Sequence, residues 1–176
     1  MAVSCYIIYD VIPFDKIPTE YVYIVQIQKT PNAPPHLLIG IKDNLFHLKV
    51  NGVRLYDSWE HLVEIIQNKK TATFIFTTTI SISNITIVNL LAIFNPYDRV
   101  SATHSCFAPI KGFLKTHYLI PSCTYWYECL DYLYTNNFIQ STQGLFYNIN
   151  TTNNIPLPTY DKESIQNTIN KRLNRE

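Results

Sequence analysis

Charged side chains are scarce in this chain, and that scarcity limits the partners it can recognise. Only 15% of the 176 residues are charged, and the formal net charge is +1. No block of Lys and Arg occurs before the last residues, NKRLNRE. Because a nucleic-acid binder normally carries a basic patch or stripe, the composition argues against nucleic acid as a partner.

The chain also lacks a long apolar run and a recognisable secretion signal. No segment reaches the roughly 18 apolar residues of a membrane-spanning helix. The opening MAVSCYIIYDVIPFDK has no basic region and is too polar for a signal peptide. We therefore expect a cytoplasmic protein without a membrane span. Its four cysteines, Cys5, Cys106, Cys123 and Cys129, should be reduced thiols in that compartment.

These cysteines do not form a metal-binding pattern. There is no CxxC pair and no Cys/His spacing typical of structural zinc. We accordingly expect no metal site and no cofactor. Hydrophobic residues make up 47% of the chain, which is enough for a sizeable core.

What is present is a series of β-branched and aromatic segments separated by turns, with a few helical patterns between them. The predicted strands are 4–12, 20–28, 36–41, 45–50 and 72–82, and the predicted helices are 57–68, 83–95, 122–136 and 161–176. Residues 99–121 are interpreted as irregular. The sequence thus predicts an α+β fold, with an antiparallel sheet of four to five strands packed against three to four helices.

The segments suggest one domain followed by a tail. We expect a single α+β domain over 1–145 and an Asn/Thr/Pro-rich loop over 146–160. The last segment, 161–176, is predicted to form a terminal helix that docks on the body or on a partner.

Cys123 is the first candidate for chemistry. It lies in the first turn of the predicted helix 122–136, where the positive end of the helix dipole favours a thiolate. A cysteine nucleophile also needs a base, usually a histidine brought close in space. His36 and His47 lie on the two strands of a predicted hairpin and could be cross-strand neighbours. Cys106, just after His104 in THSC, is a competing site, whereas Cys129 is interpreted as a core residue.

A Cys at a helix start, a His on a strand and a second His on the next strand form the three-part arrangement of papain-like enzymes. HLLIGIKDNLFHLKV followed by SCTYWYECL resembles the permuted papain-like fold of the NlpC-type superfamily, and more narrowly the lecithin retinol acyltransferase-like group. It is also similar to uncharacterised fungal domains with a strand histidine and a later Cys-x-x-Trp helix. The chain departs from that group at Leu37, where Trp is usual, and at Ser122, where Asn or Gly is usual.

The resemblance implies a cysteine hydrolase or acyltransferase. Cys123 would attack an ester, thioester or amide carbonyl with His36 as base and His47 as the orienting residue, and an acyl or peptide substrate would be cleaved. The backbone N–H groups of Cys123 and Thr124 are the expected oxyanion donors.

The alternative is a non-enzymatic, self-associating or partner-binding module on the same fold, viral or host-modulating in origin. Low charge and abundant Tyr are compatible with protein–protein contact. A buried Cys123 more than one residue layer from His36 would favour this alternative.

Overall fold

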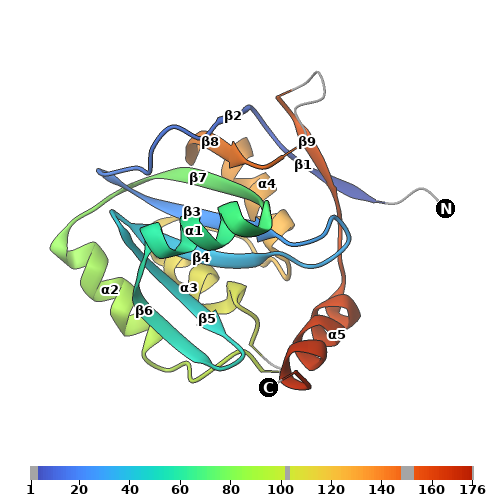
Figure 1. Ribbon diagram of the computed structural model, residues 1–176. Helices are drawn as coiled ribbons and strands as arrows, with labels where there is room; N and C mark the ends of the chain where they lie inside the picture. The colour runs from blue at the N-terminus through green and yellow to red at the C-terminus, as the bar shows by residue number, and fades with distance from the viewer. Residues whose placement is uncertain (1–3, 102–103, 148–152, 176) are drawn as a thin grey trace.

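The computed structural model describes residues 4–101, 104–147 and 153–175 (Figure 1). Within them lie a seven-stranded sheet, in the order β2-β8-β7-β3-β4-β5-β6, and a two-stranded sheet of β1 and β9. The strands are β1 (Cys5–Ile8), β2 (Val11–Pro13), β3 (Tyr21–Gln28), β4 (His36–Ile41), β5 (Asn44–Lys49), β6 (Gly52–Ser58), β7 (Ala72–Ser81), β8 (Ile139–Leu145) and β9 (Ile155–Pro158). The helices are α1 (Trp59–Lys69), α2 (Asn84–Phe94), α3 (Phe107–His117), α4 (Trp126–Thr135) and α5 (Lys162–Leu173).

The predicted antiparallel sheet of four to five strands with three to four helices is wrong. The main sheet has seven strands and is mixed: β2 and β8 pair in parallel, and the other neighbouring strands of the sheet pair antiparallel. Two of its strands, β6 and β8, are rich in polar residues and partly exposed, so they lack the apolar pattern that marks a buried strand. β9 forms in a segment predicted as a loop, of which residues 148–152 lie outside the described residues.

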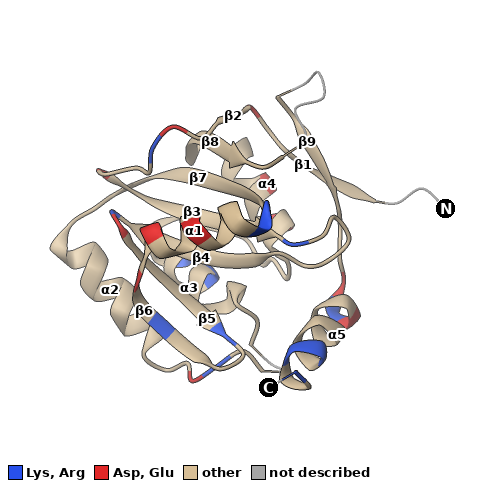
Figure 2. Ribbon diagram, in the orientation of Figure 1, with Lys and Arg blue, Asp and Glu red and all other residues tan. Residues whose placement is uncertain are grey.

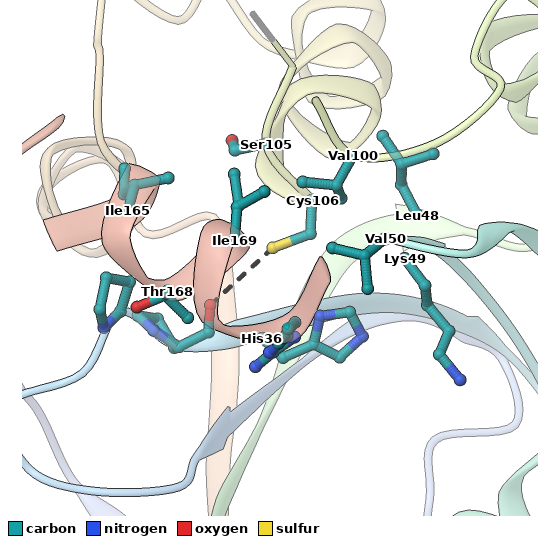
Figure 3. A pocket seen from close by; sticks show the side chains of 13 residues that line it. His36, Leu48, Lys49, Val50, Val100, Ser105, Cys106, Ile165, Thr168 and Ile169 are labelled. Carbon is teal, nitrogen blue, oxygen red and sulfur yellow. Dashed lines mark hydrogen bonds between the residues drawn. The ribbon is translucent and has the colours of Figure 1, made fainter. Parts of the chain in front are cut away.

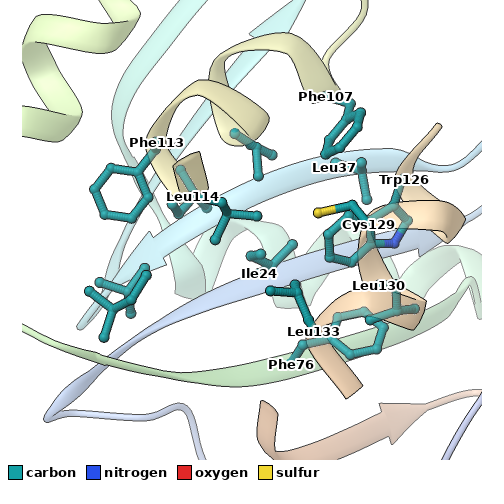
Figure 4. Close-up of a cluster of buried hydrophobic side chains, with 14 of the residues drawn as sticks. Ile24, Leu37, Phe76, Phe107, Phe113, Leu114, Trp126, Cys129, Leu130 and Leu133 are labelled. Carbon is teal, nitrogen blue, oxygen red and sulfur yellow. The ribbon is translucent and has the colours of Figure 1, made fainter. Parts of the chain in front are cut away.

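Alternation along the central strands gives the sheet two buried faces. Tyr23 and Val25 of β3 pack on one face with Trp59 of α1. Ile24 of β3 points to the other face, where it joins the cluster that includes Trp126 of α4 (Figure 4). The sheet is therefore covered by α1 on one side and by α2, α3 and α4 on the other (Figure 1). The central strands β7, β3 and β4 carry no charged residue (Figure 2).

Two helices differ from their predicted positions. The predicted irregular segment 99–121 contains α3, whose Pro109 lies in the first turn, where a helix tolerates the missing N–H. The helix predicted from Ser122 begins only at Trp126. The Glu128 carboxylate fixes that start, since it accepts hydrogen bonds from the N–H groups of Thr124 and Tyr125 at 2.6 and 2.9 Å.

The last element, α5, is a polar helix at the end of the described chain. The Asp161 carboxylate caps its N-terminus by accepting from the Ser164 N–H at 2.8 Å. Within α5, all of which is described, Ile169 is the single buried residue. None of the described helices combines the length and apolarity that crossing a membrane requires.

Candidate active site

Three side chains from neighbouring strands form a continuous hydrogen-bonded chain. Nε2 of His36, the first residue of β4, lies 2.9 Å from Nδ1 of His47 on β5. Nε2 of His47 lies 3.0 Å from Oδ2 of Asp57, near the end of β6. The other carboxylate oxygen of Asp57 accepts a hydrogen bond from the Ser58 N–H at 3.1 Å. The structure thus brings the predicted histidine pair together and adds a carboxylate to it.

A β-bulge puts Asp57 in reach of His47. Leu45 pairs with Asp57 and His47 pairs with Arg54, so two steps along β5 are opposed by three along β6. Tyr56, within this stretch, has a positive φ of 57°. In a regular strand, residues three positions apart point to opposite faces of the sheet. The extra residue of the bulge places Asp57 and Arg54 on the same face.

Burial and the neighbouring charges decide the protonation states of this chain. Burial, followed by the proximity of His47 and of the cationic side chains Arg172 and Lys49, holds the pKa of His36 well below its usual value. Burial also lowers the pKa of His47, although Asp57 opposes the change. For Asp57 itself burial favours the neutral acid, but the hydrogen bond and charge of His47 outweigh it and the pKa falls. Both imidazoles are therefore neutral and Asp57 is ionised at neutral pH.

The thiol beside this chain belongs to Cys106, at the N-terminal end of α3. Its Sγ donates to the carbonyl oxygen of Pro35 at 3.8 Å, immediately before His36. Cys106 and His36 line one small cavity of about 50 Å³ (Figure 3). Cys106 also lines a second cavity of about 40 Å³, which Tyr125, Trp126 and Tyr160 border. The thiol therefore has a histidine on one side and an aromatic recess on the other.

The Cys106 thiol is protonated in this arrangement. Burial raises its pKa, while the backbone N–H groups of Leu37, Cys106 and Phe107 act in the opposite direction, toward a lower pKa. Those N–H groups belong to the start of α3 and to β4, so donors that can stabilise a negative charge surround the sulfur. The resting pair is thus a thiol and a neutral imidazole.

Helix α5 forms one wall of the Cys106–His36 cavity. Ile165, Thr168, Ile169 and Arg172 line it together with Cys106 and His36, and Figure 3 shows the first three on α5 beside Cys106. Ile169 also packs with Leu48, Val50 and Val100 in a small separate core. Access to the thiol is therefore limited by a helix that one buried side chain anchors.

Cys123, the predicted nucleophile, lies elsewhere. It precedes α4 by three residues, is only 8% exposed and belongs to the main core cluster. Its thiol contacts that of Cys129, and burial raises the pKa of both. Neither described cavity that His36 lines has Cys123 in its wall. The structure does not bring Cys123 to the histidines, and for this cysteine that is the arrangement expected of the non-enzymatic alternative.

The expected oxyanion donors are likewise not at the histidine chain. The Thr124 N–H donates to the Glu128 carboxylate, and neither Cys123 nor Thr124 lines the two described cavities that His36 borders. Among residues 4–101, 104–147 and 153–175, no cluster of three or more His, Cys, Asp or Glu side chains could hold a metal ion.

Sequence reasoning missed Asp57 and gave Cys106 second place. The sequence offers Asp57 or Ser58 as the cap of the helix predicted over 57–68, and Ser58 is the cap, since its hydroxyl oxygen accepts from the His61 N–H at 3.4 Å. The turn signal Asn51–Gly52 predicts that the strand of His47 pairs with the segment before Asp57, but it does not predict the bulge. For Cys106 the available signal was a proline three residues later, typical of a first helical turn.

Comparison with protein-family models, with curated proteins and with solved structures finds no match for this chain.

Proposed function

We propose that the protein is a cysteine hydrolase or acyltransferase acting on an ester, thioester or amide, with Cys106 as nucleophile and His36 as general base. The observation that carries the proposal is the convergence of the Cys106 thiol and the Asp57–His47–His36 chain, with Cys106 and His36 on the same cavity. Cys106 thus takes the place that the papain-like resemblance assigned to Cys123.

The hydrogen-bonded chain supports the role of His36 because it fixes both tautomers. The Asp57 carboxylate can only accept, so His47 donates from Nε2 and its Nδ1 becomes an acceptor. His36 must then donate from Nε2 to that acceptor, which leaves its Nδ1 unprotonated. An unprotonated Nδ1 is the form a general base needs, and Asp57 and His47 act as positioning residues for it.

The proposed reaction has two halves. Nδ1 of His36 removes the proton from Cys106 Sγ as the sulfur attacks the carbonyl carbon, forming a C–S bond. The bond to the leaving oxygen, nitrogen or sulfur breaks, and His36 returns the proton to that atom. Water or an acceptor hydroxyl or amine, deprotonated by His36, then attacks the thioester and releases Cys106 as a thiol. The N–H groups at the start of α3 would stabilise the oxyanion.

The test is acylation by a panel of p-nitrophenyl esters of increasing acyl length, followed by intact-protein mass spectrometry and peptide mapping. We expect a burst of p-nitrophenol and one acyl group on Cys106. Cys106→Ser should abolish both, and His36→Ala should slow the burst by roughly 10²-fold or more.

Cys123→Ser is the matched control, since it removes a thiol outside the proposed site. It should leave the burst unchanged. A burst that survives Cys106→Ser, or that Cys123→Ser abolishes, would overturn the assignment. Absence of acylation in the folded protein with every ester would favour the non-enzymatic alternative.

A further inference from the structure

A basic groove opens beside the histidine chain and adjoins the Cys106 cavity, because His36, Lys49, Val50 and Arg172 line both. It has a volume of about 450 Å³ and is lined by His36, His47 and Asp57 together with residues of β3, β5, α1 and α5. Because His36 lines both spaces, a molecule in the groove lies next to the proposed base.

Five cationic side chains face this groove: Lys29, Lys49, Lys69, Arg172 and Arg175. They come from four separate parts of the chain: the segment after β3, the end of β5, the end of α1, and the last turn of α5 with the residues after it. The carboxylate in the lining, Asp57, is already hydrogen-bonded to His47. The lining therefore carries a large excess of positive charge, in a chain whose formal net charge is only +1.

The neighbouring cations act on Lys29 in the same direction as its burial. Burial, together with the proximity of Arg172, Lys69 and Lys49, lowers the pKa of Lys29. Like charges held together destabilise one another unless an anion joins them. Among the described residues that line the groove, Asp57 supplies the one carboxylate against five cations.

We infer that the groove binds a phosphate-type oxyanion carried by the substrate, and that Arg172, which borders both the groove and the Cys106 cavity, aligns that group with the reactive thiol. This inference rests on the proposed function, because the role of the anion is to position the substrate next to the Cys106 thiol. A doubly charged oxyanion suits the site because several cations can each donate a charge-assisted hydrogen bond to it. Apolar side chains in the same lining, Ile27, Leu38 and Leu62, would contact the uncharged remainder of the molecule.

Calorimetric titration with pyrophosphate at low ionic strength tests the inference, using Cys106→Ser protein so that no chemistry is involved. We expect saturable binding, weakened at least about tenfold when Lys49→Gln and Arg172→Gln are combined. Lys171→Gln with Lys162→Gln is the matched control, because it removes the same charge from α5 outside the groove lining. No saturable binding, or an equal loss in the control, would overturn the inference.

A second arm identifies the source of the oxyanion. The protein is sedimented with phosphatidate vesicles, and phosphatidylcholine vesicles serve as the reference. Binding to phosphatidate vesicles that pyrophosphate abolishes indicates a lipid headgroup. Pyrophosphate binding without vesicle binding indicates a soluble phosphorylated molecule. If pyrophosphate binds but no ester acylates the protein, the anion site stands and the proposed chemistry is overturned. If an ester acylates Cys106 but pyrophosphate does not bind, the proposed chemistry stands and the anion site is overturned.

Discussion

His47 has two roles that depend on its two ring nitrogens. It donates to Asp57 from Nε2 and accepts from His36 at Nδ1, so the carboxylate fixes the tautomer of both rings. The Asp57 end of this hydrogen-bonded chain lies at the surface, since the Asp57 side chain is 36% exposed. Water can therefore reach the carboxylate, while His47 is buried and His36 lines the groove.

Loss of the Asp57 carboxylate should impair the base without unfolding the protein. In Asp57→Ala, His47 can adopt either tautomer, and we expect the rate of Cys106 acylation to fall at least roughly tenfold. Stopped-flow release of p-nitrophenol measures this rate. Asp57→Asn should fall between alanine and wild type, because the amide oxygen still accepts from His47. An unchanged rate in Asp57→Ala would remove Asp57 from the site.

His36 and His47 should make the protein less stable in mild acid. The pKa values of His36 and His47 are lower in the folded state than in the unfolded chain, so the unfolded chain binds more protons below about pH 6.5. The free energy of unfolding should therefore fall as pH drops below that value. Urea unfolding of wild type and His36→Gln at a series of pH values measures it.

We expect the pH dependence of unfolding to be shallower in His36→Gln, and unchanged in the control His61→Gln, since His61 is exposed. A wild-type stability that does not change between about pH 7 and 5 would contradict the neutral assignment of the two rings.

At the level of single residues, the sequence allowed the histidine pair to be anticipated but not its partners. His36 and His47 stand on strands joined by a tight turn, and that local geometry is readable from the residues between them. Asp57 depends on a bulge between β5 and β6 and on a positive φ at Tyr56, a residue type that does not indicate such a backbone conformation. Cys106 depends on contact with Pro35, 71 positions away along the chain, and such contacts leave no local pattern.

Helix α5 controls access to the thiol through Ile169. Replacing Ile169 with alanine removes about 2–4 kcal/mol of packing, and most of that loss should fall on the docking of α5. We expect iodoacetamide to modify Cys106 several-fold faster in Ile169→Ala than in wild type, as measured by peptide mass spectrometry. Leu173→Ala, on the same helix but 42% exposed, should leave the rate unchanged. Equal rates in all three proteins would contradict a covering role for α5.

The β4 strand has its own packing constraint at Gly40. A Cβ there would lie 2.1 Å from the Tyr23 ring, whose hydroxyl donates to the Lys42 carbonyl oxygen at 2.6 Å. Gly40→Ala should therefore lower the free energy of unfolding by about 1–3 kcal/mol. Gly112→Ala in α3 should be neutral or stabilising, because its Cβ would meet Ile93 at 3.4 Å. Chemical denaturation of both variants measures the difference, and a Gly40→Ala protein as stable as wild type would contradict the packing described.

Elements with strong local signals could be predicted, and those shaped by tertiary contacts could not. The apolar strands β3, β4, β5 and β7 follow from their β-branched and aromatic residues. The edge strand β6 and the polar strand β8 form because neighbouring strands offer them hydrogen-bonding partners. The start of α4 at Trp126 depends on the Glu128 side chain, and this moved Cys123 out of the helix.

At the scale of the whole molecule, the sheet separates the two faces that the candidate site joins. His47 and Asp57 lie toward α1, whereas Cys106 begins a helix that packs on the opposite face. They meet at the end of the sheet where β4 begins, and α5 closes that end from outside (Figure 1). The proposed reaction therefore requires the assembled fold and cannot be attributed to any one segment.

The most direct test of Cys106 as the nucleophile is site-resolved labelling of the native protein with an electrophilic acyl probe. Wild type, Cys106→Ser, Cys123→Ser and His36→Ala are treated in parallel and the labelled cysteine is located by peptide mass spectrometry. We predict label on Cys106 in wild type and Cys123→Ser, strongly reduced in His36→Ala and absent in Cys106→Ser. Label on Cys123, or no label until the protein is unfolded, would contradict the assignment.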